Sequence, residues 1–595
     1  MRARILTGLK GRPYTRSPCS LFGSLALEIP PVIPVLTWLS ADQTRYLAIS
    51  EGALLAVALL AVLAALLPSL DARLSSRRGA VVFLLLVFFA LIASRWPTFP
   101  VLTVFSHDEE SYIAEAKTAL HFPIPWVDFD NQTGGPLTVF QLVLPALLGA
   151  QLNFFTCRVV AVVLEFGALA ALYGAAALCF DASIARLAVV PPLIFLAITE
   201  REPFVHLGNE PLPIFLSSVM IALICRAWRR GYPPLLYLAI GIIAGMLPFA
   251  KLQSVPIDGA ILSVAAVALL ASKDLPLRAR FARLGILAGG TLVVPLLIVG
   301  AVALAGGFRD FWISYISNAL VYMESDKPPL VYVTQNEDFG PFFDWLGAVA
   351  LGGGAIVALR FTRIPAAMRC AYIAALVILV ATIDAIEAPG RPDPNYLLFA
   401  VIPITALATA GLAAILWLIA GDSRVGRRRG LVAALFVVTC LIVQHALVRP
   451  NYDWLARGYA GYQHGLDPNP IVASITANLK PGERLAIWGY RPVYWVNTPT
   501  IMGTRDITTF WQHFPYYNPN GDYFRARYVE DMTQNRPEGF LDAGPDSWAD
   551  NGGMQGGYET FPALADVVNR DYVLKTSWDR NRFFVRRDLA ERQLP

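Results

Sequence analysis

The sequence predicts a polytopic α-helical membrane protein with a small extracytoplasmic α/β domain at its C-terminal end. Of the 595 residues, 56% are hydrophobic and only 15% are charged, whereas soluble domains are about 25% charged. The mean hydropathy is +0.52. A helix needs roughly 17–25 apolar residues to cross a bilayer, and about 11–13 stretches within residues 51–448 come close to that length. Residues 1–50 are left as an N-terminal extension without an assigned role.

The predicted spans follow one another with short polar loops between them. The run 136–150 is short and interrupted by Pro136 and Pro145, so we expect it to lie in the outer interface. The spans are expected near 52–68, 79–95, 158–179, 187–200, 211–227, 235–250, 256–271, 284–305, 341–360, 370–387, 395–419 and 431–448.

Lysine and arginine alternate from loop to loop, which predicts the orientation. Basic loops stay on the cytoplasmic side. One set of alternate loops holds most of the basic residues, at 73–78, 186, 226–230, 273–283, 360–369 and 424–429. The other loops are therefore expected outside, including an external loop at about 96–157 and the whole region 449–595.

The region 449–595 is polar and rich in aromatic residues and turns, which favours a small folded domain. "IVASITANL" (471–479) predicts a helix. "RLAIWGY" (484–490) and "PVYWV" (492–496) predict short strands. "DYVLKTS" (571–577) and "RFFVRR" (582–587) predict a terminal pair of strands.

The stretch "HDEESYIAEAKTAL" (107–120) places three consecutive carboxylates between apolar runs. One interpretation is a solvated loop, with Asp108 capping a helix and Glu110 in its first turn. The other is a functional site, because acidic groups at a membrane surface are solvated, paired or functional. The residues alone leave both open.

Further polar residues stand beside predicted helix ends on the same outer side. Lys251 follows the apolar run "GIIAGMLPFA" directly. Its long side chain could simply reach the lipid headgroups, or it could bind a lipid phosphate. The others are Asn209, Glu210, Arg391, Asn395 and Tyr396.

Other chemistries find little support. The six cysteines include no CxxC pair, which argues against a disulfide framework or a zinc site. No set of residues has metal-ligand spacing, so we expect no cofactor, with a divalent metal ion left open. The net charge of +4 is too small to indicate a nucleic-acid partner.

Four segments resemble, in order, those of GT-C membrane glycosyltransferases, such as protein O-mannosyltransferases and bacterial lipid A aminoarabinose transferase. Residues 107–120 resemble the Asp-Glu…Tyr…Ala signature of the first external loop. The segments 134–158, 245–253 and 389–403 are similar to three later motifs, and the nearest similarity is to bacterial lipopolysaccharide-core glycosyltransferases. The sequence departs from the usual residues at Gly134, Gly135 and Asn395.

The resemblance implies an enzyme of the bacterial cell envelope, in the cytoplasmic (inner) membrane, with its site on the periplasmic side. It implies that a hexosyl or pentosyl group moves from a polyprenyl-phosphate donor to a hydroxyl of a glycan, lipid or protein, with inversion. Asp108 would be the base and Glu109 its helper. The remaining implied roles are lipid-phosphate binding by Lys251, Arg391 and Arg158, and substrate contact by His107, Tyr112, Asn209, Glu210, Asn395 and Tyr396.

The main alternative is a transporter or flippase for a lipid-linked glycan. Transporters often contain repeated halves and polar sites near the middle of the membrane. This sequence shows no internal repeat, and its polar residues gather on one side.

Overall fold

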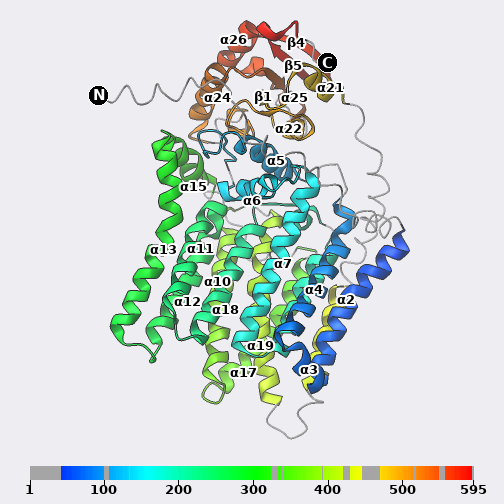
Figure 1. Ribbon diagram of the computed structural model, residues 1–595, viewed down its shortest axis with the longest axis vertical. Helices are drawn as coiled ribbons and strands as arrows, with labels where there is room; N and C mark the ends of the chain where they lie inside the picture. The colour runs from blue at the N-terminus through cyan, green and yellow to red at the C-terminus, as the bar shows by residue number, and fades with distance from the viewer. Residues whose placement is uncertain are drawn as a thin grey trace.

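The computed structural model describes residues 42–99, 106–132, 134–199, 201–322, 333, 336–337, 339–390, 393–419, 429–444, 469–513, 518–547 and 556–592. Within these ranges, a bundle of long helices carries a smaller α/β domain on one end (Figure 1). Short helices lie between the two parts.

Every predicted span coincides with a helix of the bundle, which confirms the polytopic helical fold. Among the described residues, nine helices are long and apolar enough to cross a bilayer, and four apolar helices are shorter. The bundle helices are α2 (Gln43–Leu66), α3 (Pro68–Leu74), α4 (Arg77–Arg95), α7 (Phe154–Cys179), α8 (Ala182–Ile198), α10 (Pro211–Arg229), α11 (Pro234–Ala250), α12 (Val255–Ala271), α13 (Leu277–Leu304), α17 (Phe339–Leu359), α18 (Ala366–Glu387), α19 (Leu398–Ile419) and a last helix at Arg429–Gln444.

Several of these helices begin where a polar side chain satisfies the first free backbone N–H groups. The side chain of Asn153 accepts from Thr156 N at 3.0 Å, and that of Asp181 accepts from Ile184 N at 2.8 Å. Such caps stabilise a helix start by about 1 kcal/mol. Polar loop residues therefore fix where the apolar segments become helical.

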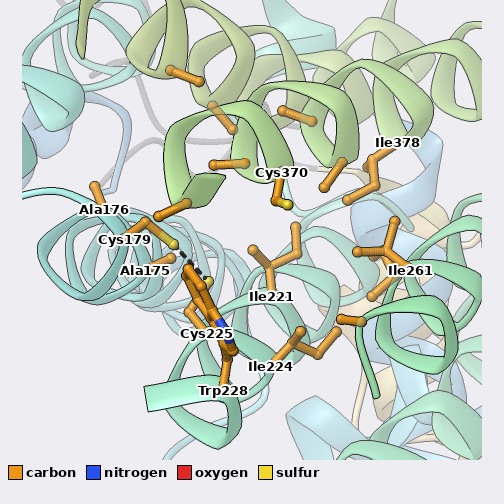
Figure 2. A pocket seen from close by; sticks show the side chains of 18 of the residues that line it. Ala175, Ala176, Cys179, Ile221, Ile224, Cys225, Trp228, Ile261, Cys370 and Ile378 are labelled. Atoms are coloured by element: carbon orange, nitrogen blue, oxygen red, sulfur yellow. Dashed lines mark hydrogen bonds between the residues drawn. The ribbon is translucent and has the colours of Figure 1, made fainter. Parts of the chain in front are cut away.

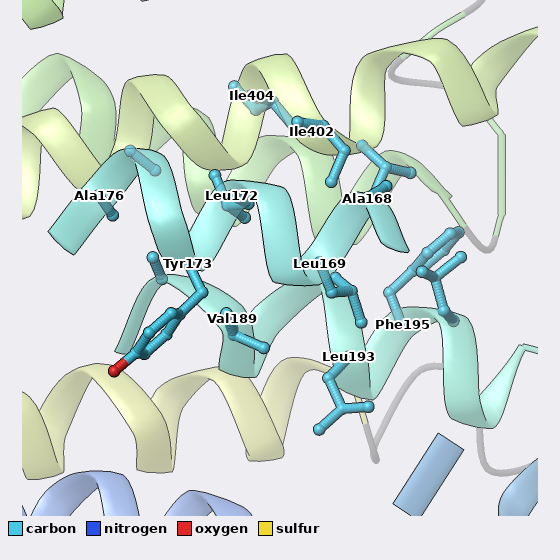
Figure 3. Packing of buried hydrophobic residues seen from close by; sticks show 14 of the residues in the cluster. Ala168, Leu169, Leu172, Tyr173, Ala176, Val189, Leu193, Phe195, Ile402 and Ile404 are labelled. Carbon is cyan, nitrogen blue, oxygen red and sulfur yellow. The ribbon is translucent and has the colours of Figure 1, made fainter. Parts of the chain in front are cut away.

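The core of the bundle is centred on α19, which is packed among α7, α8 and α17. In its most apolar stretch, 89% of α19 is buried, against 17% for α13 at the edge of the bundle. Figure 3 shows Leu169 of α7 packed toward Leu193 and Phe195 of α8, with Ile402 and Ile404 of α19 close by. A helix that is apolar on every side is therefore accommodated at the centre.

The loops rich in arginine lie at the end of the bundle opposite the α/β domain (Figure 1). At the other end, α5 (His107–Ala119) and α6 (Pro136–Leu147) lie across the bundle, as expected for a run that does not cross the membrane. The remaining short helical segments are η2 (Trp96–Thr98), α9 (Glu202–Val205), η3 (Leu252–Ser254), α14 (Phe308–Asp310), η4 (Phe311–Ser317), α15 (Asn318–Tyr322) and η5 (Pro394–Leu397).

The α/β domain contains a five-stranded mixed sheet of order β2-β1-β3-β5-β4. Strand β1 is parallel to β2 and β3, whereas β5 is antiparallel to β3 and β4. The strands are β1 (Arg484–Trp488), β2 (Ile501–Met502), β3 (Gly539–Asp542), β4 (Tyr572–Trp578) and β5 (Asn581–Arg586). The helices are α21 (Pro470–Asn478), α22 (Val493–Asn497), α23 (Phe510–His513), α24 (Gly521–Asn535), α25 (Gly544–Ser547) and α26 (Pro562–Asp571), with η8 (Tyr558–Thr560) and η9 (Arg587–Leu589).

Three sequence predictions for this domain are confirmed and one is wrong. The helix at α21, the strand at β1 and the terminal hairpin β4–β5 are present. The predicted strand 492–496 is instead the helix α22, which begins after Pro492. Proline sets a backbone angle suited to a helix start, and this overrides the strand preference of the valine and aromatic residues that follow.

The domain limits differ slightly from the sequence expectation. Helix α2 begins at Gln43, inside the stretch assigned to the N-terminal extension. The predicted junction at 449 lies outside the described residues, and the described part of the α/β domain begins at 469.

Candidate active site

Helix α5 carries the three carboxylates. The first of them, Asp108, does not cap the helix. Ser106, not Asp108, is the N-cap, because the Ser106 Oγ accepts a hydrogen bond from the Asp108 N–H at 3.2 Å. Asp108 is half-buried, and its carboxylate makes no hydrogen bond to any described residue. The helix N-terminus itself favours a negative charge at this position.

One face of α5 is formed by residues four and three positions apart, namely Asp108, Tyr112 and Glu115. Tyr112 and Glu115 are fully buried. Burial raises the pKa of Glu115 well above its ordinary value, although the Asn131 Nδ2 donates to Glu115 Oε2 at 2.7 Å. The Tyr112 hydroxyl has no hydrogen-bond partner among the described residues. This face of α5 is therefore polar, and Asp108 lies at its N-terminal end.

Glu109 points into the protein and is paired with Arg158 of α7. The Arg158 Nε lies 3.1 Å from Glu109 Oε1 and Nη2 lies 2.9 Å from Oε2, and both side chains are fully buried. Arg158 Nη1 also donates to the Thr98 carbonyl at 2.7 Å. The pair anchors α5 to the bundle. The roles of Glu109 as a helper base and of Arg158 as a phosphate ligand stay predictions.

Lys251 lies in a cluster formed by three segments that are far apart in the sequence. Its ammonium group is ion-paired with the fully buried Glu210. It also lies over the Tyr396 ring, 4.4 Å from the centroid. The Asn395 Nδ2 donates to Glu210 Oε1 at 2.9 Å. The structure thus brings together four of the predicted site residues, which we call the Lys251 cluster: Glu210, Lys251, Asn395 and Tyr396.

The Lys251 cluster acts electrostatically on Asp108. Burial raises the pKa of Asp108, and the charge of Glu210 raises it further. The positive charges of His206, Lys251 and His107 lower it, in that order of strength among the cations. Asp108 is therefore a carboxylate with a perturbed pKa and opposing charges around it, as is common at catalytic positions.

Asn209 is the remaining predicted contact, and it faces the glycines that replace the usual residues. Its Oδ1 is buried without a hydrogen-bond partner among the described residues. A methyl group at Gly134 would lie 2.5 Å from this Oδ1, and one at Gly135 would overlap the Phe249 carbonyl. The Gly135 N–H donates to the Ala250 carbonyl at 3.1 Å. The two glycines therefore let this loop lie directly against the end of α11.

The α/β domain covers α5 and completes the surroundings of the carboxylates. Lys117 Nζ donates to the carbonyls of Trp495, Val496 and Thr498 at 2.7, 3.0 and 3.1 Å. The Tyr490 ring lies 4.9 Å from the His107 ring. His107 is exposed on one side, and its Nδ1 lies 3.3 Å from Glu110 Oε2. Glu110, the third carboxylate, thus fixes His107 rather than only starting the helix.

A network of buried charges joins the α/β domain to the outer loops. Arg527 Nη1 donates to Asp130 Oδ2 at 2.8 Å and its Nη2 is paired with Asp506. The Arg505 guanidinium pairs with Asp531 at 2.6 Å and with Asp310 at 3.3 Å. Removing one partner of a buried ion pair lowers the stability of a folded protein by several kcal/mol. The network therefore fixes the α/β domain against these loops.

Several of these residues were predicted from the sequence, and others were not. Arg391 lies outside the described residues. Glu115, Asn131 and His206 were not predicted as site residues, and Tyr490 had no predicted role. Only Glu115 had a clear signal, because it lies seven residues after Asp108 on one helix face. Among the described residues, no group of three or more His, Cys, Asp or Glu side chains could hold a metal ion.

Comparisons with known proteins add to this geometry. No protein-family model matches the chain, and no curated protein matches it. ArnT from Cupriavidus metallidurans in the apo state has a TM-score of 0.50 at 16% identity, covering 87% of this chain and 100% of ArnT.

Two further solved structures have lower TM-scores. ArnT bound to undecaprenyl phosphate has a TM-score of 0.49 at 16% identity, over 87% and 100% of the two chains. The Archaeoglobus fulgidus oligosaccharyltransferase in complex with zinc and sulfate has a TM-score of 0.41 at 12% identity, over 83% and 72%. The apo ArnT structure shows that the chain shares the overall fold of ArnT, as the sequence resemblance implied.

Proposed function

We propose that this protein is a membrane glycosyltransferase that uses a polyprenyl-phosphate-linked sugar as its donor. One observation carries the proposal: the Asp108 carboxylate, which makes no hydrogen bond to a described residue, lies within the electrostatic reach of Lys251, at the end of the bundle that is covered by the α/β domain. A base and a cation at the end of the membrane-spanning bundle meet the two needs of the reaction. The proposed function does not specify which sugar is transferred or which acceptor receives it.

In the proposed reaction, Asp108 accepts the proton of an acceptor hydroxyl as the hydroxyl oxygen attacks the anomeric carbon. The bond between that carbon and the phosphate oxygen breaks, and the phosphate leaves with the electron pair. A direct displacement of this kind inverts the anomeric centre. General-base catalysis of this type contributes about 10²–10⁴-fold to the rate.

Lys251 would stabilise the charge that develops on the leaving phosphate. Glu210 and the Tyr396 ring hold the ammonium group in place before the substrate arrives. A cation that is already positioned needs no reorganisation during the reaction, which is where electrostatic catalysis gains most. Arg391 stays a predicted second cation.

Helix α5, which carries Asp108, lies at the bundle end next to the α/β domain and away from the described arginine-rich loops (Figure 1). Lys251 lies within electrostatic reach of Asp108. By the charge rule this end faces the outside of the cytoplasmic membrane. Nucleotide sugars are absent there, so a lipid-linked donor is the chemically reasonable source of an activated sugar.

The test is a comparison of envelope glycans between a deletion strain and strains complemented with the wild-type protein or with Asp108→Asn. Loss of one sugar in the deletion strain, restored only by the wild-type protein, is expected. Glycans that lack no sugar but accumulate on the inner side of the membrane would contradict the proposal and support a flippase.

A further inference from the structure

A large apolar cavity lies in the half of the bundle toward the arginine-rich loops. Its volume is about 430 Å³, and α7, α10, α12, α18 and α19 form its wall. Figure 2 shows Ile221 of α10, Ile261 of α12 and Ile378 of α18 around it. Two hydroxyl groups in the wall are bonded within their own helices: Ser218 Oγ donates to Ile214 O, and Thr409 Oγ1 donates to Thr405 O, both at 2.7 Å. The Cys179 and Cys225 Sγ atoms bond to each other between α7 and α10 at 3.2 Å.

An apolar cavity of this size lowers the stability of the protein when it is empty. Water does not enter a cavity without polar partners, and an empty cavity forfeits the dispersion contacts of its lining. Most of the described lining consists of alanine, isoleucine and other apolar side chains. Such a lining matches a hydrocarbon chain better than a polar ligand.

The depth of the cavity corresponds to one leaflet of a bilayer. Along α18 the lining extends from Ala366 to Ile378, or about 18 Å at 1.5 Å per residue. Half of the hydrocarbon core of a bilayer is about 15 Å. An extended acyl chain that enters from the arginine-rich end would fill it.

The mouth of the cavity is polar and carries an excess of positive charge. Ser272, Lys273 and Asp274 lie at its rim, together with Trp228. Arg226 and Arg229 occupy the last turn of α10 next to it. Tryptophan is enriched at the membrane interface, and basic residues there attract anionic headgroups.

We infer that this cavity binds one acyl chain of an anionic phospholipid, whose phosphate lies at Lys273. The lipid belongs to the leaflet at the arginine-rich end. The site is separate from the Lys251 cluster, which lies at the opposite end of the bundle. It is a structural lipid site, independent of the proposed sugar transfer.

The experiment uses the full-length protein in phosphatidylcholine nanodiscs. They contain a trace of phosphatidylglycerol with a photoreactive diazirine near the end of one acyl chain. After irradiation, adducts are mapped by mass spectrometry. We expect adducts on the lining of α12 and α18, around Ile261 and Ile378. A phosphatidylcholine probe of the same chain should label about fivefold less, because one lysine near the headgroup contributes about 1 kcal/mol.

Two variants of α18 separate the cavity from the lipid-facing surface. Ala374→Trp fills the cavity and should reduce the adducts to background, whereas Leu376→Trp, at a position that is 42% exposed and outside the lining, should leave them unchanged. Lys273→Gln should remove the preference for phosphatidylglycerol. If Ala374→Trp does not fold, Ala374→Leu and the comparison of headgroups in the wild-type protein serve the same purpose.

Three results would overturn the inference. The first is labelling of the lining that Ala374→Trp does not change. The second is equal labelling by the two phospholipid probes. The third is stronger labelling by a photoreactive polyprenyl phosphate than by phosphatidylglycerol, which would assign the cavity to the donor lipid.

Discussion

The Arg158 guanidinium holds the Glu109 carboxylate by two hydrogen bonds of 2.9 and 3.1 Å, and neither side chain is exposed to solvent. Two neighbouring carboxylates of one helix therefore differ: Glu109 is paired with Arg158, whereas Asp108 makes no side-chain hydrogen bond within the described part of the chain. We expect Arg158→Met to destabilise the protein by about 3–5 kcal/mol, because it leaves a buried charge without its partner. The measurement is the thermal midpoint of the detergent-solubilised protein.

The double variant Glu109→Gln/Arg158→Met is the control for this pair. It removes both charges and should recover part of the lost stability. If Glu109→Gln instead abolished sugar transfer at an unchanged thermal midpoint, Glu109 would act in the chemistry.

Asp108→Asn should reduce sugar transfer by about 10²–10⁴-fold while the protein stays folded, because it removes the base and keeps the shape. The assay follows a radiolabelled sugar from a polyprenyl-phosphate donor. Asp522→Asn, an exposed position in the first turn of α24, is the matched control and should transfer at the wild-type rate. A fully active Asp108→Asn protein would remove the catalytic assignment.

Lys251→Met should lower the catalytic rate by about 10²–10³-fold, in the range observed when one electrostatic stabiliser of a transition state is removed. The loss should appear mainly in kcat, since the charge on the phosphate develops in the transition state. Lys480→Met, an exposed lysine of the α/β domain, is the control. A change in KM alone would instead assign Lys251 to ground-state binding of the donor.

The activity should depend on pH through Asp108. Because burial raises the pKa of Asp108, the basic form is lost at a higher pH than for an exposed aspartate, and kcat/KM should rise with pH through that shifted value. His206 lowers this pKa by its positive charge, so His206→Asn should move the acidic limb to higher pH. His121→Asn, at an exposed position, should leave the profile unchanged. A limb that moves to lower pH in His206→Asn would contradict the assignment.

Gly135→Ala should destabilise the outer end of the bundle by about 1–3 kcal/mol, as overpacking of a close contact does. The added methyl group overlaps the Phe249 carbonyl. Gly174→Ala is the control, because nothing lies within 4 Å of a methyl group at that position of α7. Equal thermal midpoints for the two variants would show that the loop can move away from α11.

The sequence predicted the helices well and their pairings poorly. Apolar runs bounded by polar loops identify spans, and the isolated Lys251 stood out because both of its flanks are apolar. The pairing of Glu109 with Arg158 could not be predicted, since it depends on how α5 meets α7. Local preference also failed at 492–496, where Pro492 and the contacts of Lys117 override the strand tendency.

The hydrogen bonds from Lys117 to the carbonyls of Trp495, Val496 and Thr498 have a consequence for the order of folding. Lys117 and Trp495 are 378 positions apart, so α5 leaves the ribosome long before its partners exist. The surface of α5 that faces the α/β domain is covered only after the bundle helices and residue 495 have been synthesised. The contact between α5 and α22 is therefore a late step of folding, and chains that stop before residue 495 lack this cover over α5.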